Sequence, residues 1–323
     1  WLIKSKSEKY SLKGKRVFVA GHTGMVGSAL IRLLQDIDCE ILTVSSKKLD
    51  LKKSYDVDNW FHENKPDTVF LAAAKVGGIL ANNSYPASFL YENLAIQNSV
   101  IENSFKHKIK KLMFLGSSCI YPKNAKQPIN ENSLLTGELE PTNEAYAIAK
   151  IAGIKLCQFY RSQHGVDYIS VMPTNLYGPR DNFHPQNSHV VAALIYKFYE
   201  AVKLNKKEVV LWGTGKPLRE FMHVDDLAQG LIFLMENYSD TQHINIGTGK
   251  EISIKEFANI IKNISGWEGT IKFDNNYPDG MYRKVMDISK INKLGWYSKI
   301  TLKNGLINSY NWFSENYENI EKK

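Results

Sequence analysis

Residues 16–27 read RVFVAGHTGMVG, a short apolar run followed by glycines at every third position. The first five residues predict a β-strand, and apolar residues at helical spacing predict a helix over 25–35. Glycine allows a tight turn between the two and lets backbone N–H groups approach a pyrophosphate beside the positive end of the helix. We therefore interpret Gly21, Gly24 and Gly27 as the phosphate-binding turn of a dinucleotide site, with a purely structural turn as the alternative.

The same alternation of strand and helix continues through the first half of the chain. Apolar runs and helical spacing predict strands at 40–44, 68–73, 111–117 and 168–172, and long helices at 86–107 and 143–164. Near-continuous apolar strands separated by helices are typical of a parallel sheet covered on both faces. The predicted fold class is therefore α/β, a Rossmann-type doubly wound parallel sheet.

The second half of the chain is less regular. The patterns predict strands at 209–212 and 243–246, a strand end running into a helix at 220–235, and amphipathic helices at 254–264 and 302–313. No clean linker separates the halves. We predict a cofactor-binding domain over residues 1–178, a segment near 212–240 that returns to it, and a smaller C-terminal substrate-binding α/β domain over 179–323.

Composition limits the classes of function. The chain has 323 residues, of which 43% are hydrophobic and 23% charged, as in ordinary globular proteins. The net charge is +8, yet apart from a short run at 106–111 the basic residues are scattered and accompany no nucleic-acid-reading motif. We therefore predict no nucleic-acid partner, although the charge suits a phosphorylated substrate. No apolar run reaches the roughly 18 residues of a membrane span, so we also predict no membrane partner.

The three cysteines, Cys39, Cys119 and Cys157, form neither a disulfide framework nor a paired metal-binding motif. We predict no metal site and a reducing, cytoplasmic location. A free cysteine at a strand end is most often a small buried hydrophobic residue. For Cys119 that interpretation stays open beside a chemical one.

The residues after the second predicted strand select the dinucleotide. NAD sites usually place an Asp or Glu there to bind the ribose 2′-hydroxyl. This chain has Val44-Ser45-Ser46-Lys47-Lys48 instead, and the hydroxyl and ammonium groups suit a 2′-phosphate. We predict NADP(H) as the cofactor, with Ser45 and Ser46 among its contacts.

Tyr146 and Lys150 form a YxxxK pair on the second long helix, where the i, i+4 spacing places both side chains on one face. A nearby ammonium stabilises phenolate, so we expect Lys150 to lower the pKa of Tyr146. Such a tyrosine can protonate a carbonyl oxygen as hydride arrives at its carbon, and the strand-end Ser117 can donate to the same oxygen. A second pair, Tyr199 and Lys203, follows no strand-end serine and is interpreted as a solvated helix.

Together, the glycine turn, the strand-end serine and the YxxxK pair resemble the extended short-chain dehydrogenase/reductase family. Longer stretches resemble one branch of it, the epimerase-reductases that make GDP-L-fucose. These stretches are AGHTGMVGSA (20–29), AAAKVGGI (72–79), GSSCIYPKNAKQPI (116–129), EPTNEAYAIAKIAGIKLC (140–157), MPTNLYGPRDNFHPQNSHV (172–190) and WGTGKPLREFMHVDDLA (212–228). The resemblance covers about residues 16–315.

This resemblance implies a two-stage reaction. C3 and C5 of GDP-4-keto-6-deoxy-D-mannose, both α to the C4 ketone, are epimerised through enolates, and hydride from NADPH then reduces C4 to give GDP-L-fucose. The resemblance also implies that Cys119 is the base that removes the α-protons and that His189 is the acid that reprotonates the opposite face. Ser117 and Tyr146 would hold the C4 oxygen in both stages, since the enolate oxygen and the reduced alkoxide occupy one place and need the same donors.

The residue patterns and the resemblance together predict the binding residues. Those expected at the cofactor are Gly21, Thr23, Gly24, Met25, Val26, Gly27, Ser45, Ser46, Leu115, Gly116, Ser117, Ser118, Tyr146, Lys150, Pro173, Thr174, Asn175, Leu176 and His189. Those expected at the GDP-sugar are Lys197, Trp212, Arg219 and Asp279. Arg219 can hold a pyrophosphate with its forked donors, and Trp212 offers an apolar surface. As alternatives, Trp212 belongs to the core, Lys197 is a solvated helix charge, and Asp279 is a turn residue.

The sequence departs from the family pattern at the cofactor. Thr23 stands where a typical bacterial member has an arginine, and no arginine occurs at 44–46, where the family's arginines bind the 2′-phosphate. The departure concerns NADP selectivity and not the fold.

Several alternatives stay open. The same chemistry could act on another GDP-4-keto sugar, such as a 6-deoxyheptose or a precursor of colitose. A cofactor-retaining 4-epimerase would share the Tyr and Lys but lack the Cys and His, and a non-catalytic cofactor-binding scaffold or regulator could use the same fold. By analogy with the superfamily, the helices at 86–107 and 143–164 predict a homodimer joined by a four-helix bundle.

Overall fold

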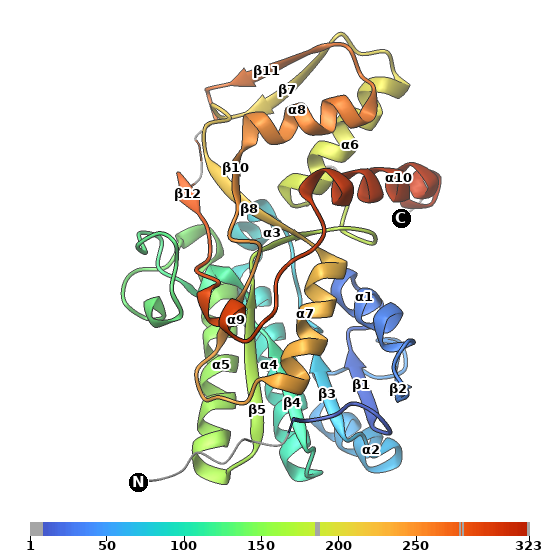
Figure 1. The fold of residues 1–323 in the computed structure, drawn as a ribbon, viewed down its shortest axis with the longest axis vertical. Helices are drawn as coiled ribbons and strands as arrows, with labels where there is room; N and C mark the ends of the chain where they lie inside the picture. The colour runs from blue at the N-terminus through green and yellow to red at the C-terminus, as the bar shows by residue number, and fades with distance from the viewer. Residues whose placement is uncertain (1–8, 185–187, 278, 280, 322–323) are drawn as a thin grey trace.

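The largest sheet in the computed structural model, which describes residues 9–184, 188–277, 279 and 281–321, is wholly parallel (Figure 1). Its strand order is β2-β1-β3-β4-β5-β9. The strands are β1 (Arg16–Ala20), β2 (Glu40–Leu42), β3 (Thr68–Leu71), β4 (Lys111–Leu115), β5 (Asp167–Pro173) and β9 (Ile244–Ile246). The order reverses at β1, which has β2 on one side and β3 on the other. In such sheets, ligands bind at the carboxyl ends of the strands beside the reversal.

Helices cover both faces of this sheet (Figure 1). On one face, α1 (Met25–Leu34) and α7 (Val224–Asn237) share a core with alternate strand residues such as Val17 and Val19. On the other face, the intervening strand residue Phe18 lies in a core with α2 (Ser54–Asn64), α4 (Pro86–Lys106) and α5 (Glu144–His164). The doubly wound α/β fold predicted from the sequence is therefore confirmed.

A smaller lobe is built around β8 (Leu218–His223), which pairs with β6 (Asn175–Tyr177), β10 (Glu251–Ser253) and β12 (Arg283–Lys284). A separate two-stranded sheet joins β7 (Glu208–Trp212) to β11 (Thr270–Asp274). The helices α6 (Val190–Lys203), α8 (Ile254–Ser265) and α10 (Leu302–Glu321) contribute Phe198, Phe257 and Phe313 to its core. Two short helices, α3 (Ile79–Ser84) and α9 (Ser289–Lys293), complete the larger lobe.

Three loops at the carboxyl ends of the large sheet bring distant residues together. β1 leads into Gly21, β4 into Gly116, and β5 into Thr174. α7 packs against α1, and β9 pairs with β5, so residues far along the chain complete the larger lobe. Within the described residues, no helix combines the length and apolar character needed to cross a membrane.

Several predicted boundaries differ from the structure. The strands predicted at 40–44, 68–73 and 111–117 end at Leu42, Leu71 and Leu115, since the chain leaves the sheet there for loops. The second YxxxK pair does lie on a helix, but Tyr199 is not solvated: its ring packs on Tyr317 with centroids 4.7 Å apart.

Candidate active site

The glycine turn between β1 and α1 is closely packed. Gly21 has φ +90°, and a Cβ at this position would lie 2.7 Å from the backbone nitrogen of Ala73. A Cβ on Gly27 would lie 2.1 Å from the carbonyl oxygen of Gly21. No side chain caps α1 at Gly24, and its first turn contains no acidic residue. The helix N-terminus therefore faces the turn without a competing carboxylate, which fits it for a phosphate group.

The loop after β2 forms a polar turn. The Ser45 carbonyl accepts the N–H groups of Lys48 and Leu49 at 2.9 and 3.0 Å. This turn leaves Ser46 and Lys47 exposed to solvent. The carboxylate that follows, Asp50, accepts the backbone N–H of Lys52 at 3.1 Å. The turn thus exposes the hydroxyl of Ser46 and the ammonium of Lys47, while the nearby Asp50 carboxylate is already bonded to the backbone of Lys52.

The loop after β4 carries Ser117 and Cys119. Gly116 packs so tightly against β5 that a Cβ there would lie 2.3 Å from the sulfur of Met172. A short 3₁₀ turn over Ser118–Ile120 follows, and the Ser117 hydroxyl accepts the N–H of Cys119 at 3.4 Å. Cys119 is buried, whereas Ser117 remains half-buried. The turn therefore presents a hydroxyl and a thiol side by side.

On α5, Tyr146 and Lys150 are one helical turn apart, as the sequence predicts. The Lys150 ammonium donates to the Leu115 carbonyl at 2.8 Å, which joins α5 to the end of β4. The same nitrogen lies 5.7 Å from the centroid of the Tyr146 ring. Tyr146 also packs edge-on against Phe89, with ring centroids 6.4 Å apart.

The protonation states differ from the sequence-based expectation. Burial lowers the pKa of Lys150 to about 8. Burial, and then the charge of Cys119, raise the pKa of Tyr146. The expected lowering of the Tyr146 pKa by Lys150 is therefore wrong for this structure, because desolvation of the phenolate outweighs the weakened ammonium. Tyr146 is held as a neutral phenol, ready to donate.

Cys119 is influenced by a residue that the sequence reasoning missed. Burial raises the pKa of its thiol. The Lys284 ammonium opposes this rise most strongly, followed by the hydrogen bond with Ser117 and the Lys150 ammonium. Lys284 lies on β12, a strand of the smaller lobe. A nearby cation favours the thiolate, so the site contains the partner that a cysteine base requires.

Lys284 also acts on His189, the predicted acid. His189 is the N-cap residue of α6, and part of its surface is open to solvent while protein atoms surround the rest. Desolvation by the surrounding protein, and then the Lys284 charge, lower its pKa. The imidazolium is consequently a stronger acid than usual. Lys284 therefore lies in electrostatic contact with both members of the predicted base and acid pair.

The predicted substrate residues extend from this cluster. Lys284 is opposite Arg219 in the pairing of β12 with β8. Burial lowers the pKa of Arg219, and the charge of Asp279 opposes this shift. The Asp279 carboxylate accepts two hydrogen bonds from Thr214, from its N–H at 2.8 Å and its hydroxyl at 2.6 Å. Asp279 therefore fixes the turn after β7 and also lies near Arg219.

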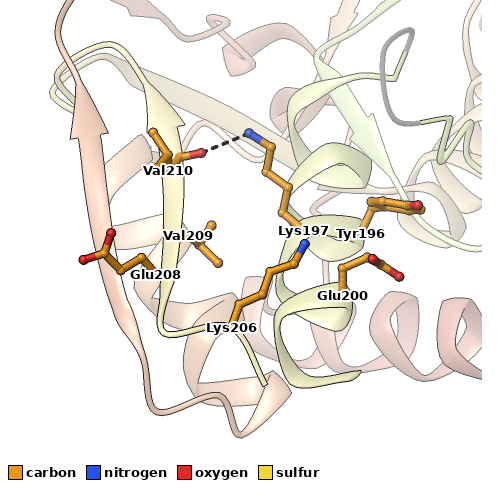
Figure 2. Close-up of a pocket in the computed structure, with 7 residues that line it drawn as sticks. All are labelled: Tyr196, Lys197, Glu200, Lys206, Glu208, Val209 and Val210. Carbon is orange, nitrogen blue, oxygen red and sulfur yellow. Dashed lines mark hydrogen bonds between the residues drawn. The ribbon is translucent and has the colours of Figure 1, made fainter. Parts of the chain in front are cut away.

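Trp212 and Lys197 lie further out. Trp212 is 66% exposed, so it does not belong to the core, and its ring stacks on Tyr277 at 4.3 Å and 11°. The Lys197 ammonium lies 5.7 Å from the centroid of the Trp212 ring. It also donates to the Val210 carbonyl at 3.1 Å (Figure 2). Lys197 also lines a cavity of about 210 Å³ between α6 and β7, which contains none of the five predicted catalytic residues (Figure 2).

The last predicted cofactor residues run from Pro173, at the end of β5, through Thr174 to Asn175 and Leu176 in β6. The Thr174 N–H donates to the Ile246 carbonyl of β9 at 3.0 Å, and its side chain hydrogen-bonds Glu220. The Asn175 side-chain amide donates to the backbone carbonyl of Glu220 at 2.9 Å. In the part of the chain that the structure describes, no group of three or more His, Cys, Asp and Glu side chains is placed to hold a metal ion.

Comparison with known proteins agrees with this geometry. Residues 17–247 match the NAD dependent epimerase/dehydratase family. A protein of Arabidopsis thaliana, GDP-L-fucose synthase 1, is 55% identical over 97% of this chain and 98% of its own length. The crystal structure of a GDP-L-fucose synthetase from Naegleria fowleri bound to NADP is 30% identical, with a TM-score of 0.90 over 97% of each chain. A GDP-6-OMe-4-keto-L-xylo-heptose reductase from C. jejuni is 38% identical, with a TM-score of 0.89 over 95% of this chain and 99% of that one.

Proposed function

The chain belongs to the NAD dependent epimerase/dehydratase family, and from this premise we propose that it converts GDP-4-keto-6-deoxy-D-mannose to GDP-L-fucose with NADPH. One observation supports this particular reaction more specifically than family membership does. The Cys119 thiol lies within the electrostatic influence of Tyr146, Lys150 and Lys284. A ketone held by Tyr146 and Ser117 would therefore have a base beside its α-carbons, as a combined epimerase and reductase requires.

In the epimerisation, Cys119 removes the proton from C3 or C5 as its thiolate. Lys284 and the hydrogen bond with Ser117 favour that thiolate. The electrons of the broken C–H bond move onto the C4 oxygen, where hydroxyl donors from Ser117 and Tyr146 stabilise the enolate. His189 returns a proton to the opposite face of the carbon, and its lowered pKa suits it to release that proton.

In the reduction, the same oxygen becomes an alkoxide and needs a proton. Tyr146 supplies it, because burial has kept its phenol protonated. Lys150, close to the phenol ring and held on Leu115, stabilises the charge that develops on Tyr146. When bound, the nicotinamide cofactor supplies the hydride that C4 accepts.

The proposed cofactor is NADP(H). The glycine turn and the α1 N-terminus suit the pyrophosphate, and Ser45, Ser46 and Lys47 suit the 2′-phosphate. These groups would replace the arginines that this chain lacks.

The nucleotide end of the substrate is proposed to lie along the smaller lobe. Arg219 can hold the pyrophosphate with paired N–H donors, next to the Lys284 charge. Trp212 offers an exposed aromatic face, and Lys197 lies beside that ring. Asp279 places Thr214 and Arg219 for this contact through its hydrogen bonds and its charge.

A second candidate is the same chemistry on a GDP-4-keto heptose. The similarity to the C. jejuni heptose reductase favours it, since one extra carbon changes few contacts. Incubation of the purified protein with NADPH and each GDP-4-keto sugar, followed by NMR of the product, decides between them. GDP-L-fucose formed with one NADPH consumed per product supports the proposal. A product that retains its original C3 and C5 configuration, or turnover without NADPH consumption, contradicts it.

We also propose a homodimer in a reducing compartment. The faces of α4 and α5 expose large apolar side chains, among them Tyr91 at 71% and Phe159 at 62%, as an interface between two copies would require. Three free cysteines, including the proposed base Cys119, suit a reducing compartment such as the cytoplasm. A sedimentation mass near 37 kDa would contradict the dimer, since one chain weighs 36.8 kDa.

A further inference from the structure

Glu220, on β8, is a buried carboxylate at the junction of the two lobes. Its side chain has 0% exposure. The residues that follow it on β8 divide between the two cores: Phe221 packs in the smaller lobe and Met222 in the larger. Burial of a carboxylate without partners costs free energy of folding, so the partners of Glu220 indicate its role.

Five hydrogen-bond donors surround this carboxylate. Oε1 accepts the N–H groups of Thr248 at 2.6 Å and Gly249 at 2.9 Å, and the Thr248 hydroxyl at 3.5 Å. Oε2 accepts the N–H of Met286 at 2.8 Å. The fifth donor is the side-chain hydroxyl of Thr174. Burial raises the pKa of Glu220, and the hydrogen bonds from these donors oppose that rise because they stabilise the ionised carboxylate.

These donors come from segments with different tasks in the proposed reaction. Thr174 follows β5, where the nicotinamide is expected. Met286 comes two residues after Lys284, the cation that acts on Cys119 and His189. On the strand itself, Arg219 precedes Glu220, and side chains alternate between the faces of a strand. One carboxylate therefore ties the cofactor side of the site to the substrate side.

The fit around the carboxylate leaves no room for adjustment. A Cβ on Gly247 would lie 2.1 Å from Oε1 of Glu220. The backbone of Glu220 is held as well, because its carbonyl accepts the Asn175 amide at 2.9 Å. Glutamine at this position would have nearly the same shape as glutamate. Its NH₂ group, however, would face N–H or O–H donors on one side and could not accept their hydrogen bonds.

We propose that Glu220 is a positioning residue for hydride transfer, which fixes the Thr174 loop relative to the strands that carry Arg219 and Lys284. This inference rests on the proposed function, since it needs a hydride acceptor held by the smaller lobe. Glu220 touches neither the reacting atoms nor the cofactor. It sets the distance between the two sides of the site.

The test compares Glu220→Gln with Glu251→Gln. Glu251 lies opposite Glu220 in the β8–β10 pairing, but it is less buried than Glu220 and forms an ion pair with Arg283. It is therefore a matched control. Misplacement by about 1 Å can slow a reaction about 100-fold, so we expect Glu220→Gln to lower the single-turnover rate of C4 reduction by about 10- to 100-fold. The KM values for NADPH and sugar should change little, and Glu251→Gln should leave the reduction rate unchanged.

The isotope effect of C4-deuterated NADPH on kcat distinguishes a positioning role of Glu220 from a purely structural one. If positioning is lost, hydride transfer becomes slower than the other steps, and the isotope effect on kcat should rise. A Glu220→Gln variant that keeps the wild-type reduction rate overturns the inference. A variant whose losses lie in KM and in the melting temperature, with an unchanged isotope effect, overturns it too.

Two variants keep the inference testable if Glu220→Gln does not fold. Thr174→Val removes only the hydroxyl that bonds Glu220, whereas Thr174→Ser retains it. The reduction rate should fall clearly further in Thr174→Val than in Thr174→Ser, and equal losses overturn the inference. Wild-type protein that reduces no GDP-4-keto sugar overturns the proposed function together with this inference, whereas an active wild type with unaffected variants overturns this inference alone.

Discussion

Lys284 lies directly opposite Arg219 in the parallel pairing of β12 with β8. Side chains at such paired positions point to the same face of a sheet. Burial lowers the pKa of the Lys284 ammonium, the charge of Cys119 opposes that shift, and the Arg219 charge adds to it. We therefore propose that the two residues have separate roles, with Arg219 at the nucleotide end of the substrate and Lys284 beside the proposed base Cys119 and the proposed acid His189.

Replacement of Lys284 by methionine tests this division. The Lys284 charge lowers the pKa of both Cys119 and His189, so its loss should raise both values. One pKa unit corresponds to about a tenfold change in thiolate at neutral pH, so α-proton exchange should slow about tenfold and its pH profile should move upward. Deuterium incorporation from heavy water, followed by NMR as a function of pH, measures both. Lys272→Met, on the exposed strand β11, is the control, and an unmoved profile in Lys284→Met would falsify the assignment.

Cys119→Ser and Tyr146→Phe should separate the two stages. Serine is a far weaker base than a cysteine thiolate, so Cys119→Ser should suppress α-proton exchange while some C4 reduction remains. Loss of a general acid costs roughly 10²- to 10⁴-fold, so Tyr146→Phe should lose reduction by such a factor with little change in NADPH affinity. Stopped-flow NADPH oxidation and deuterium exchange give the two rates separately. Tyr199→Phe, in the other YxxxK pair, should leave both rates unchanged; wild-type exchange in Cys119→Ser would remove the thiol from the mechanism.

Ser46→Asp tests the choice of dinucleotide. Ser46 is exposed in the turn after β2, and a carboxylate there would repel a 2′-phosphate while accepting a ribose hydroxyl. The kcat/KM ratio of NADPH to NADH should fall about tenfold, which corresponds to about 1.4 kcal/mol. Steady-state kinetics with both cofactors measure the ratio, and Ser11→Asp controls for added charge. Equal efficiency of NADH and NADPH in the wild type would contradict the preference itself.

A buried histidine makes stability depend on pH. His243 Nε2 lies 3.0 Å from the Tyr121 hydroxyl, which itself donates to the Asn245 side-chain oxygen at 2.5 Å. Because the Tyr121 hydroxyl hydrogen is donated to Asn245, the hydroxyl oxygen can only accept from His243. A neutral His243 must therefore carry its proton on Nε2 and donate it to Tyr121. Burial lowers the pKa of His243 to about 4, from an ordinary value of 6.5. The unfolded chain consequently takes up a proton at a pH where the folded protein does not.

The free energy of unfolding of the wild type should therefore fall as the pH drops from about 6.5 to about 4. The loss due to His243 alone should reach about 3 kcal/mol. His243→Gln keeps an N–H donor for Tyr121 without a titrating group, so its free energy of unfolding should depend less on pH. Urea unfolding at a series of pH values compares the two proteins. His189 and His223, whose pKa values are also lowered, contribute to the slope in both proteins and cancel in the difference. Parallel pH curves would contradict this role for His243.

Local signals in the sequence were sufficient for the framework of the site. The strand, glycine turn and helix around Gly21 lie together within residues 16–34, and the i, i+4 spacing of Tyr146 and Lys150 depends only on helix geometry. By contrast, Lys284 lies on a two-residue strand whose place depends on pairing with distant β8. No local pattern marks such a residue.

Burial explains the other differences. The raised pKa of Tyr146 depends on how much protein surrounds the phenol, which spacing does not reveal. The helix α2 was not predicted because Val57 and Phe61 are its buried residues and the rest of it is polar or partly exposed. Trp212 could be core or surface by composition, and its exposure follows from its position at the end of β7.

The return of α7 and β9 to the larger lobe means that neither half of the molecule is one continuous piece of chain. A fragment ending near residue 178 would lose an edge strand and would leave Leu30 and Leu34 of α1 without the helix that covers them. The remainder would keep Met222 and Leu231 without the residues of β1, α1 and β5 that share their core. If the chain were divided at that point, each fragment would lack part of its own interior, so we expect that mixing two separately produced fragments would not give an active protein.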